Sequence, residues 1–139
     1  MGPHPIIKLF MIPNAIEWVF ALLILFQVKH FLADFVFQNV YMLRKGSPNW
    51  DFVVPLSIHA GIHALSTLPI VLYVNPSVWW LSVMDFFIHF VMDRIKAGPR
   101  YLGRFDDLNS KAYWVTFGAD QMMHHLTHIL IIWILVTHV

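Results

Sequence analysis

Four long apolar stretches constrain the fold of this chain of 139 residues more than any other feature. They run from Ile16 to Tyr41, from Phe52 to Val74, from Ser77 to Ala97 and from Ala112 to Thr137. A helix needs about 20 apolar residues to cross roughly 30 Å of hydrocarbon. The composition agrees, because 58% of the residues are hydrophobic and only 12% are charged, about half the charge of a soluble domain. The sequence therefore predicts an all-α fold, in which residues 1–139 form one integral membrane four-helix bundle with four transmembrane spans.

The placement of the cations predicts an orientation for this bundle. With four spans, both termini lie on one side, and the loops after the first and third spans lie on the other. Only Lys8 lies on the side of the termini, whereas seven cations lie on the loop side: Arg44, Lys45, Arg94, Lys96, Arg100, Arg104 and Lys111. Because cytoplasmic loops carry an excess of Lys and Arg, we expect cytoplasmic loops and both termini on the non-cytoplasmic side. The net charge of only +1 argues against a nucleic-acid partner.

Each apolar stretch contains a pair of polar side chains that are four residues apart. The pairs are His30 with Asp34, His59 with His63, His89 with Asp93, and Asp120 with His124. A spacing of four places both members on one face of a helix. At about 1.5 Å per residue, every pair falls in the loop-side half of the bilayer. We therefore expect these eight side chains to converge in one layer inside the bundle.

A bound metal explains this layer better than hydrogen bonds alone. Each buried Asp costs about 3 kcal/mol on insertion scales, so Asp34, Asp93 and Asp120 together cost on the order of 9 kcal/mol. A tightly bound divalent ion contributes about 10 kcal/mol or more. Five imidazoles and three carboxylates suit one or two divalent transition metal ions, with Zn first and Mn or Fe as alternatives. The chain has no cysteine, so thiolate sites are excluded. Asp–His pairs without a metal remain the alternative.

Further residues extend this prediction. We expect Asp34, Asp93 or Asp120 to accept a proton during catalysis and Lys96 to hold an anionic group above the metals. Gln38 and Gln121 are candidates to orient the ligands, against plain interhelical hydrogen bonding. Asp85 either extends the layer or pairs with Lys29. The loop from Gly98 to Lys111 either covers the site or binds anionic headgroups.

Four strings carry a resemblance to a known family: HFLADFVFQ (His30 to Gln38), HAGIHAL (His59 to Leu65), HFVMDRIK (His89 to Lys96) and DQMMHH (Asp120 to His125). In order and spacing they resemble the small bacterial membrane family called domain of unknown function 3307, from about Phe26 to Ile134. The resemblance implies a multi-pass protein of the bacterial inner membrane. It also implies one common site: His30, Asp34, Gln38, His59, His63, His89, Asp93, Lys96, Asp120, Gln121 and His124. More distantly, the chain is similar to predicted membrane-bound metal-dependent hydrolases, which are also small helical bundles rich in His and Asp.

These features lead to one functional prediction and several alternatives. We expect a metal-dependent, membrane-embedded hydrolase that acts at the cytoplasmic leaflet on a lipid or amphiphile with an anionic headgroup. A metal-ion or proton transporter or channel is the first alternative, because His and Asp also line ion pathways. A membrane di-iron oxidase or hydroxylase and a purely structural role are the others. Membrane lipids are the expected partners, and homo-oligomers are left open.

Overall fold

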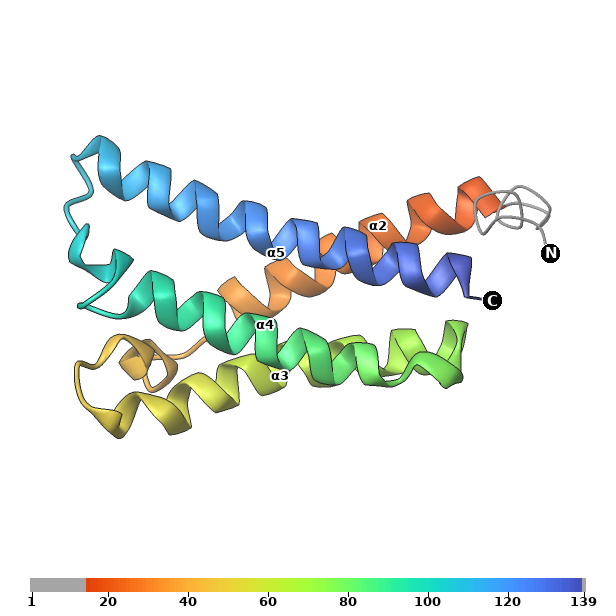
Figure 1. The fold of residues 1–139 in the computed structure, drawn as a ribbon, viewed down its shortest axis with the longest axis horizontal. Coiled ribbons are helices and arrows are strands. Elements are labelled where there is room, and N and C mark those ends of the chain that lie inside the picture. The colour runs from red at the N-terminus through yellow and green to blue at the C-terminus, as the bar shows by residue number, and fades with distance from the viewer. Residues whose placement is uncertain (1–14, 139) are drawn as a thin grey trace, which may run out of the picture.

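Four long helices, joined by short helical turns, form the part of the chain that the computed structural model describes, residues 15–138. The long helices are α2 (Ala15–Phe31), α3 (Val53–Val74), α4 (Trp80–Ala97) and α5 (Lys111–Thr137). They lie side by side, and the loops from α2 to α3 and from α4 to α5 share one end of the bundle (Figure 1). We call this the loop end. The start of α2, the turn between α3 and α4, and the end of α5 share the opposite end, which we call the terminal end. No strand occurs within residues 15–138, which confirms the all-α prediction.

Three of the four predicted spans agree with the helices to within a few residues. The third span is divided at its start into the short turn η4 (Pro76–Val78) and α4. Before η4, the Asn75 side chain accepts a hydrogen bond from the Ser77 N–H. At the start of α5, the Ser110 hydroxyl accepts one from the Tyr113 N–H at 3.2 Å. These side-chain caps satisfy backbone donors that the first turn of a helix leaves free.

The prediction for the first span was wrong at its end, because the helix does not continue to Tyr41. After α2, one wide turn η1 (Leu32–Val36) closes with a bond of 2.8 Å from Phe37 N to Leu32 O, and the chain then leaves the helix. The Asn39 side chain accepts a hydrogen bond from Met42 N at 3.1 Å, which fixes the turn into η2 (Met42–Gly46). Such local bonds from Asn compete with the helical ladder. The apolar pattern continues through this turn and therefore does not mark the helix end.

An apolar core fills the terminal end of the bundle. Its buried members come from all four helices and from η4: Leu22, Phe26, Val71, Val78, Leu81, Ile131, Ile132, Leu135 and Val136. The outer surface is also apolar, since large side chains on every helix are exposed, among them Ile24 at 63%, Leu65 at 70%, Phe87 at 60% and Leu126 at 50%. Two segments, Ala15–Val36 and Trp50–Val74, are long and apolar enough to cross a membrane.

Candidate metal centre

The bundle brings the eight predicted side chains together in its loop-end half. Seven of them are almost completely buried, and the side chain of Asp34 is 15% exposed. Each helix contributes one pair: His30 lies in α2 with Asp34 in η1, His59 and His63 lie in α3, His89 and Asp93 in α4, and Asp120 and His124 in α5. The spacing of four and the alternating direction of the helices therefore produce the expected layer.

Imidazoles and carboxylates alternate across this layer. The Nε2 atom of His59 lies 3.3 Å from Asp34 Oδ1 and 2.9 Å from Asp93 Oδ2. On the other side of Asp93, His124 Nε2 lies 3.2 Å from Asp93 Oδ1 and 3.2 Å from Asp120 Oδ1. Asp93 is thus the central carboxylate, with one oxygen toward each of the two histidines.

Two groups of donors in the layer that include carboxylates are compact enough to surround an ion. In one group, Asp34 and His59 join His63, whose Nε2 atom lies 2.9 Å from Asp34 Oδ1. The other group consists of Asp93, Asp120 and His124. Within each group, one ligand atom per residue lies within 4.8 Å of the others. Because His59 also lies against Asp93, the two groups are adjacent, and the Asp93 carboxylate lies between His59 of the first group and His124 of the second.

Hydrogen bonds leave many polar atoms of this layer unsatisfied. Within the described residues, 11 buried side-chain nitrogen and oxygen atoms have no hydrogen-bond partner, and seven of them belong to the layer. His59 Nε2 and Asp120 Oδ1 are among these atoms, although His59 Nε2 lies near the Asp93 carboxylate and Asp120 Oδ1 lies near the His124 imidazole. Native proteins pair nearly all buried polar groups, since an unpaired one costs about 1 to 3 kcal/mol. Donor atoms that converge without hydrogen-bond geometry are the arrangement that a metal ion satisfies.

Lys45 belongs to the site, although the sequence predicts it only as one of the loop cations. Its Nζ atom lies 2.9 Å from Asp93 Oδ2 and donates to Gln38 Oε1 at 2.9 Å. The guanidinium of Arg94 donates to the carbonyls of Lys45 at 3.1 Å and Ser47 at 2.9 Å, which ties η2 to α4. This long-range bond turns Lys45 inward, and no local sequence signal predicts it.

The remaining predicted residues lie at the edge of the layer. Lys96 Nζ lies 3.5 Å from Asp120 Oδ2, and its side chain is 30% exposed. Gln121 lies between two candidate ligands, because its Oε1 atom is 3.1 Å from His30 Nε2 and its amide donates to Asp120 Oδ2 at 3.2 Å. Gln38 contacts Lys45 instead of a candidate ligand. Lys45 and Lys96 thus place two cations beside the carboxylates, toward the loop end.

A second buried polar group lies nearer the terminal end. Lys29 Nζ lies 2.8 Å from Asp85 Oδ2, which agrees with one of the two alternatives for Asp85. Asp85 also accepts from the Thr67 hydroxyl at 2.6 Å and lies 3.0 Å from His89 Nδ1, so it extends the layer as well. His128 is completely buried in the same region, and both of its ring nitrogens lack a partner. His128 is not among the eight metal ligands that the sequence predicts.

The fold and this layer define a class: helical bundles with a buried His/Asp centre whose donors could hold metal ions. The chain belongs to the family described as "Protein of unknown function (DUF3307)", whose model matches residues 22–139. This confirms the family resemblance. No curated protein and no solved structure matches the chain significantly. The similarity to membrane-bound metal-dependent hydrolases stays a prediction.

Proposed function

We propose that the bundle spans a bacterial inner membrane with all four helices and that its loop end is cytoplasmic. The exposed apolar side chains on every helix support this, because a soluble protein seldom exposes such large apolar surfaces. The loop end carries the cations, with Arg44, Arg100 and Arg104 exposed, as the positive-inside rule requires for a cytoplasmic side. The candidate metal centre then lies within the cytoplasmic half of the membrane.

The absence of cysteine makes this topology directly testable. Leu108 is exposed in the loop between α4 and α5, and Ser77 is exposed in the turn at the terminal end. In intact bacterial cells, a membrane-impermeant maleimide should label Ser77→Cys and should label Leu108→Cys only after the cells are opened. Labelling of Leu108→Cys in intact cells would reverse the orientation. Release of the protein from membranes by alkaline carbonate would refute the insertion itself.

We further propose that the protein is a metal-dependent hydrolase of a lipid or amphiphile with an anionic headgroup. The position of Asp93 carries this proposal, because its two oxygens face His59 and His124, each with a further carboxylate beside it. With Asp34, His59 and His63 on one side and Asp120 and His124 on the other, Asp93 would help to hold divalent metal ions. Metal ions held there would activate water and polarise a phosphoryl or carbonyl oxygen.

The protein side chains around Asp93 have distinct tasks in this proposal. Asp34, whose side chain is the most exposed of the eight, is placed to accept a proton from water. Lys45 and Lys96 lie beside the carboxylates on the loop side and would bind an anionic headgroup. A lipid phosphate or carboxylate approaching from the cytoplasmic leaflet would reach these lysines first.

An apolar groove between α4 and α5 supports an amphiphilic substrate. It has a volume of about 520 Å³ and is lined by Phe87, Ile88, Val91, Met92, Met123, Leu126, Thr127 and Leu130. These residues flank His89, Asp93 and His124 along the two helices, so the groove lies at the depth of the layer. An acyl chain in the groove would place its headgroup toward the loop end.

The terminal end favours hydrolysis over transport. An ion that crossed the bundle would have to pass from the layer through the core around Phe26, Val71 and Leu81, which are completely buried. This core is packed from apolar side chains of all four helices. A transport path through a single chain would therefore have to cross this apolar cluster.

Metal content and lipid turnover test the proposed function together. The purified protein should contain one or two transition metal ions per chain by elemental analysis. Loaded with Zn²⁺ or Mn²⁺, it should release water-soluble headgroup or fatty acid from vesicles of phosphatidylglycerol and phosphatidic acid, as followed by mass spectrometry. The products should disappear with a chelator and with His124→Ala, but not with His138→Ala at the exposed terminal end. A protein that binds no metal would refute the proposal, as would one whose lipid turnover is unaffected by His124→Ala.

A further inference from the structure

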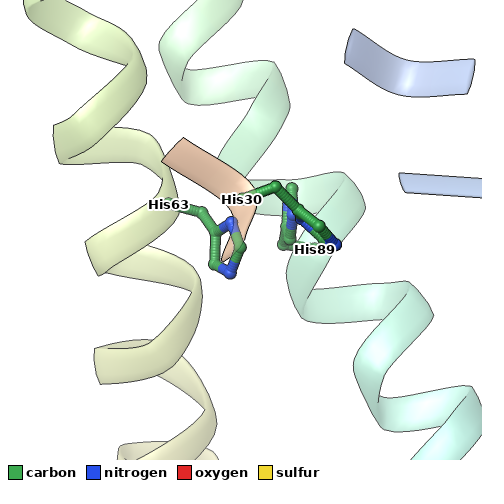
Figure 2. Close-up of side chains that lie close together, drawn as sticks. All are labelled: His30, His63 and His89. Carbon is green, nitrogen blue, oxygen red and sulfur yellow. The ribbon is translucent and has the colours of Figure 1, made fainter. Parts of the chain in front are cut away.

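Three histidines from three helices form a group without any carboxylate ligand. They are His30 of α2, His63 of α3 and His89 of α4, and one ring nitrogen of each lies within 4.8 Å of the others. Figure 2 shows their rings gathered between the helices. His30 is 4% exposed, and His63 and His89 are completely buried. Three imidazoles thus meet where water has almost no access.

Each of these imidazoles has one nitrogen beside a protein oxygen and the other nitrogen without a partner. His30 Nε2 lies 3.1 Å from Gln121 Oε1, His63 Nε2 lies 2.9 Å from Asp34 Oδ1, and His89 Nδ1 lies 3.0 Å from the backbone oxygen of Asp85. The unpartnered atoms are His30 Nδ1, His63 Nδ1 and His89 Nε2. Metal-binding histidines usually donate their second N–H to an oxygen, which leaves a lone pair for the metal. All three imidazoles of the group follow this pattern.

The Asp85 carboxylate lies beside His89 Nδ1, the atom that also faces the Asp85 backbone oxygen. Asp85 Oδ1 lies 3.0 Å from His89 Nδ1, while Oδ2 accepts from Lys29 at 2.8 Å and from Thr67 at 2.6 Å. Asp85 is completely buried, and the ammonium of Lys29 compensates its charge within the bundle. A carboxylate held in this way favours a proton on His89 Nδ1 and leaves Nε2 free for a ligand.

We propose that His30, His63 and His89 form a further metal site with nitrogen ligands only, which shares His63 with the group of Asp34 and His59, and that Asp85 is its positioning residue. Imidazole ligands suit Zn²⁺ and Cu²⁺, whereas carboxylates suit Mn²⁺ and Mg²⁺. The protein therefore has two sites with different metal preferences, joined where His63 contacts Asp34. A metal at the nitrogen site crosslinks α2, α3 and α4. The proposal does not depend on hydrolysis at the Asp93 centre.

Copper provides a probe that separates the two sites. The full-length protein, purified in detergent without metal, receives one equivalent of Cu²⁺ and is examined by electron paramagnetic resonance. We expect hyperfine structure from three nitrogens in the wild type and in Asp93→Asn, which alters only the carboxylate-rich centre. His89→Gln should remove this signal and weaken Cu²⁺ binding at least about 100-fold. His138→Ala, a histidine substitution at the exposed terminal end, should leave both unchanged.

Asp85→Asn tests the positioning role independently. Without the carboxylate, the orientation of His89 is less well fixed, and we expect Cu²⁺ affinity to fall about 10-fold to 100-fold with a changed hyperfine pattern. Helix content by circular dichroism identifies variants that fail to fold. In a folded protein, a Cu²⁺ signal that His89→Gln leaves intact would overturn the proposal. So would a signal that Asp93→Asn abolishes, because the two sites would then be one. The loss of Mn²⁺ binding in Asp93→Asn reports separately on the Asp93 centre.

Discussion

The two halves of the bundle are equally well buried but chemically opposite. In the terminal half, side chains such as Val71, Leu81 and Leu135 are completely excluded from solvent and belong to one apolar cluster. In the loop-end half, His59, His63 and His89 are excluded to the same degree, yet each has at least one ring nitrogen without a hydrogen-bond partner. The same four helices build both halves.

The two halves of the bundle are therefore stabilised by different interactions. The apolar core of the terminal half needs no other component, because packing satisfies apolar side chains. The loop-end half contains unpaired buried polar groups, which oppose folding unless a partner satisfies them. Its donor groups could hold metal ions as such partners. The loop-end half should therefore respond to metal and the terminal half should not, which yields three further predictions.

The largest expected effect comes from Asp93→Asn. This change keeps the size of the side chain but removes the charge that lies between His59 and His124. Metal ions contribute several kcal/mol to catalysis, and the loss of about 4 kcal/mol lowers the rate about 1,000-fold. We expect lipid turnover to fall by about that factor and the metal content of the carboxylate-rich centre to be lost in elemental analysis.

Asp51→Asn is the matched control for this change. Asp51 is an exposed carboxylate that pairs with Arg44 at 3.2 Å in the loop between α2 and α3. Metal content and turnover should stay at wild-type values in this variant. Equal effects of the two substitutions would mean that general charge at the loop end, and not the Asp93 centre, binds the metal.

The terminal half should show the opposite behaviour in Leu135→Ala. Removal of this completely buried side chain leaves a cavity in the apolar core and should lower the free energy of unfolding by about 2 to 4 kcal/mol. Metal content per folded chain should not change. Thermal unfolding in detergent, with and without a chelator, measures both properties. Leu126→Ala, at a half-exposed position of the same helix, should cost much less. Loss of metal in the folded Leu135→Ala protein would show that the halves are not independent.

The same contrast explains which features the sequence predicts. The layer follows from His and Asp pairs at a spacing of four, because helix geometry and alternating chain direction determine where such pairs meet. The pairing of Lys29 with Asp85 can be predicted in a similar way, since a charged residue in an apolar span is costly unless it is paired. Periodicity and burial cost therefore predict the helices and most of the layer.

Features that depend on irregular backbone are not predictable in this way. The helix ends at Phe31 instead of continuing to Tyr41 because of the wide turn η1 and the Asn39 bond to Met42, which no apolar pattern reports. Lys45 enters the site only because the loop folds back and Arg94 bonds to its carbonyl. Lys45 is expected only as a loop cation, because its contact with Asp93 joins residues 48 positions apart and leaves no local pattern in the sequence.

Lys45→Met should produce the smallest effects. It should raise the affinity for metal and lower the affinity for substrate. The ammonium lies 2.9 Å from Asp93 Oδ2 and repels a metal ion that approaches this oxygen. Without it, the affinity of the carboxylate-rich centre for Mn²⁺ should rise at least about 5-fold, because two unit charges about 4 Å apart interact by about 1 kcal/mol even in bulk water. The KM for phosphatidic acid vesicles should rise by a similar factor, because the headgroup loses one cation. Lys111→Met, at an exposed position at the start of α5, is the control and should change neither value. A fall in the affinities for both Mn²⁺ and phosphatidic acid would instead mean that Lys45 supports the position of Asp93. The loop-end half would then contain an ion pair that stabilises the protein without metal.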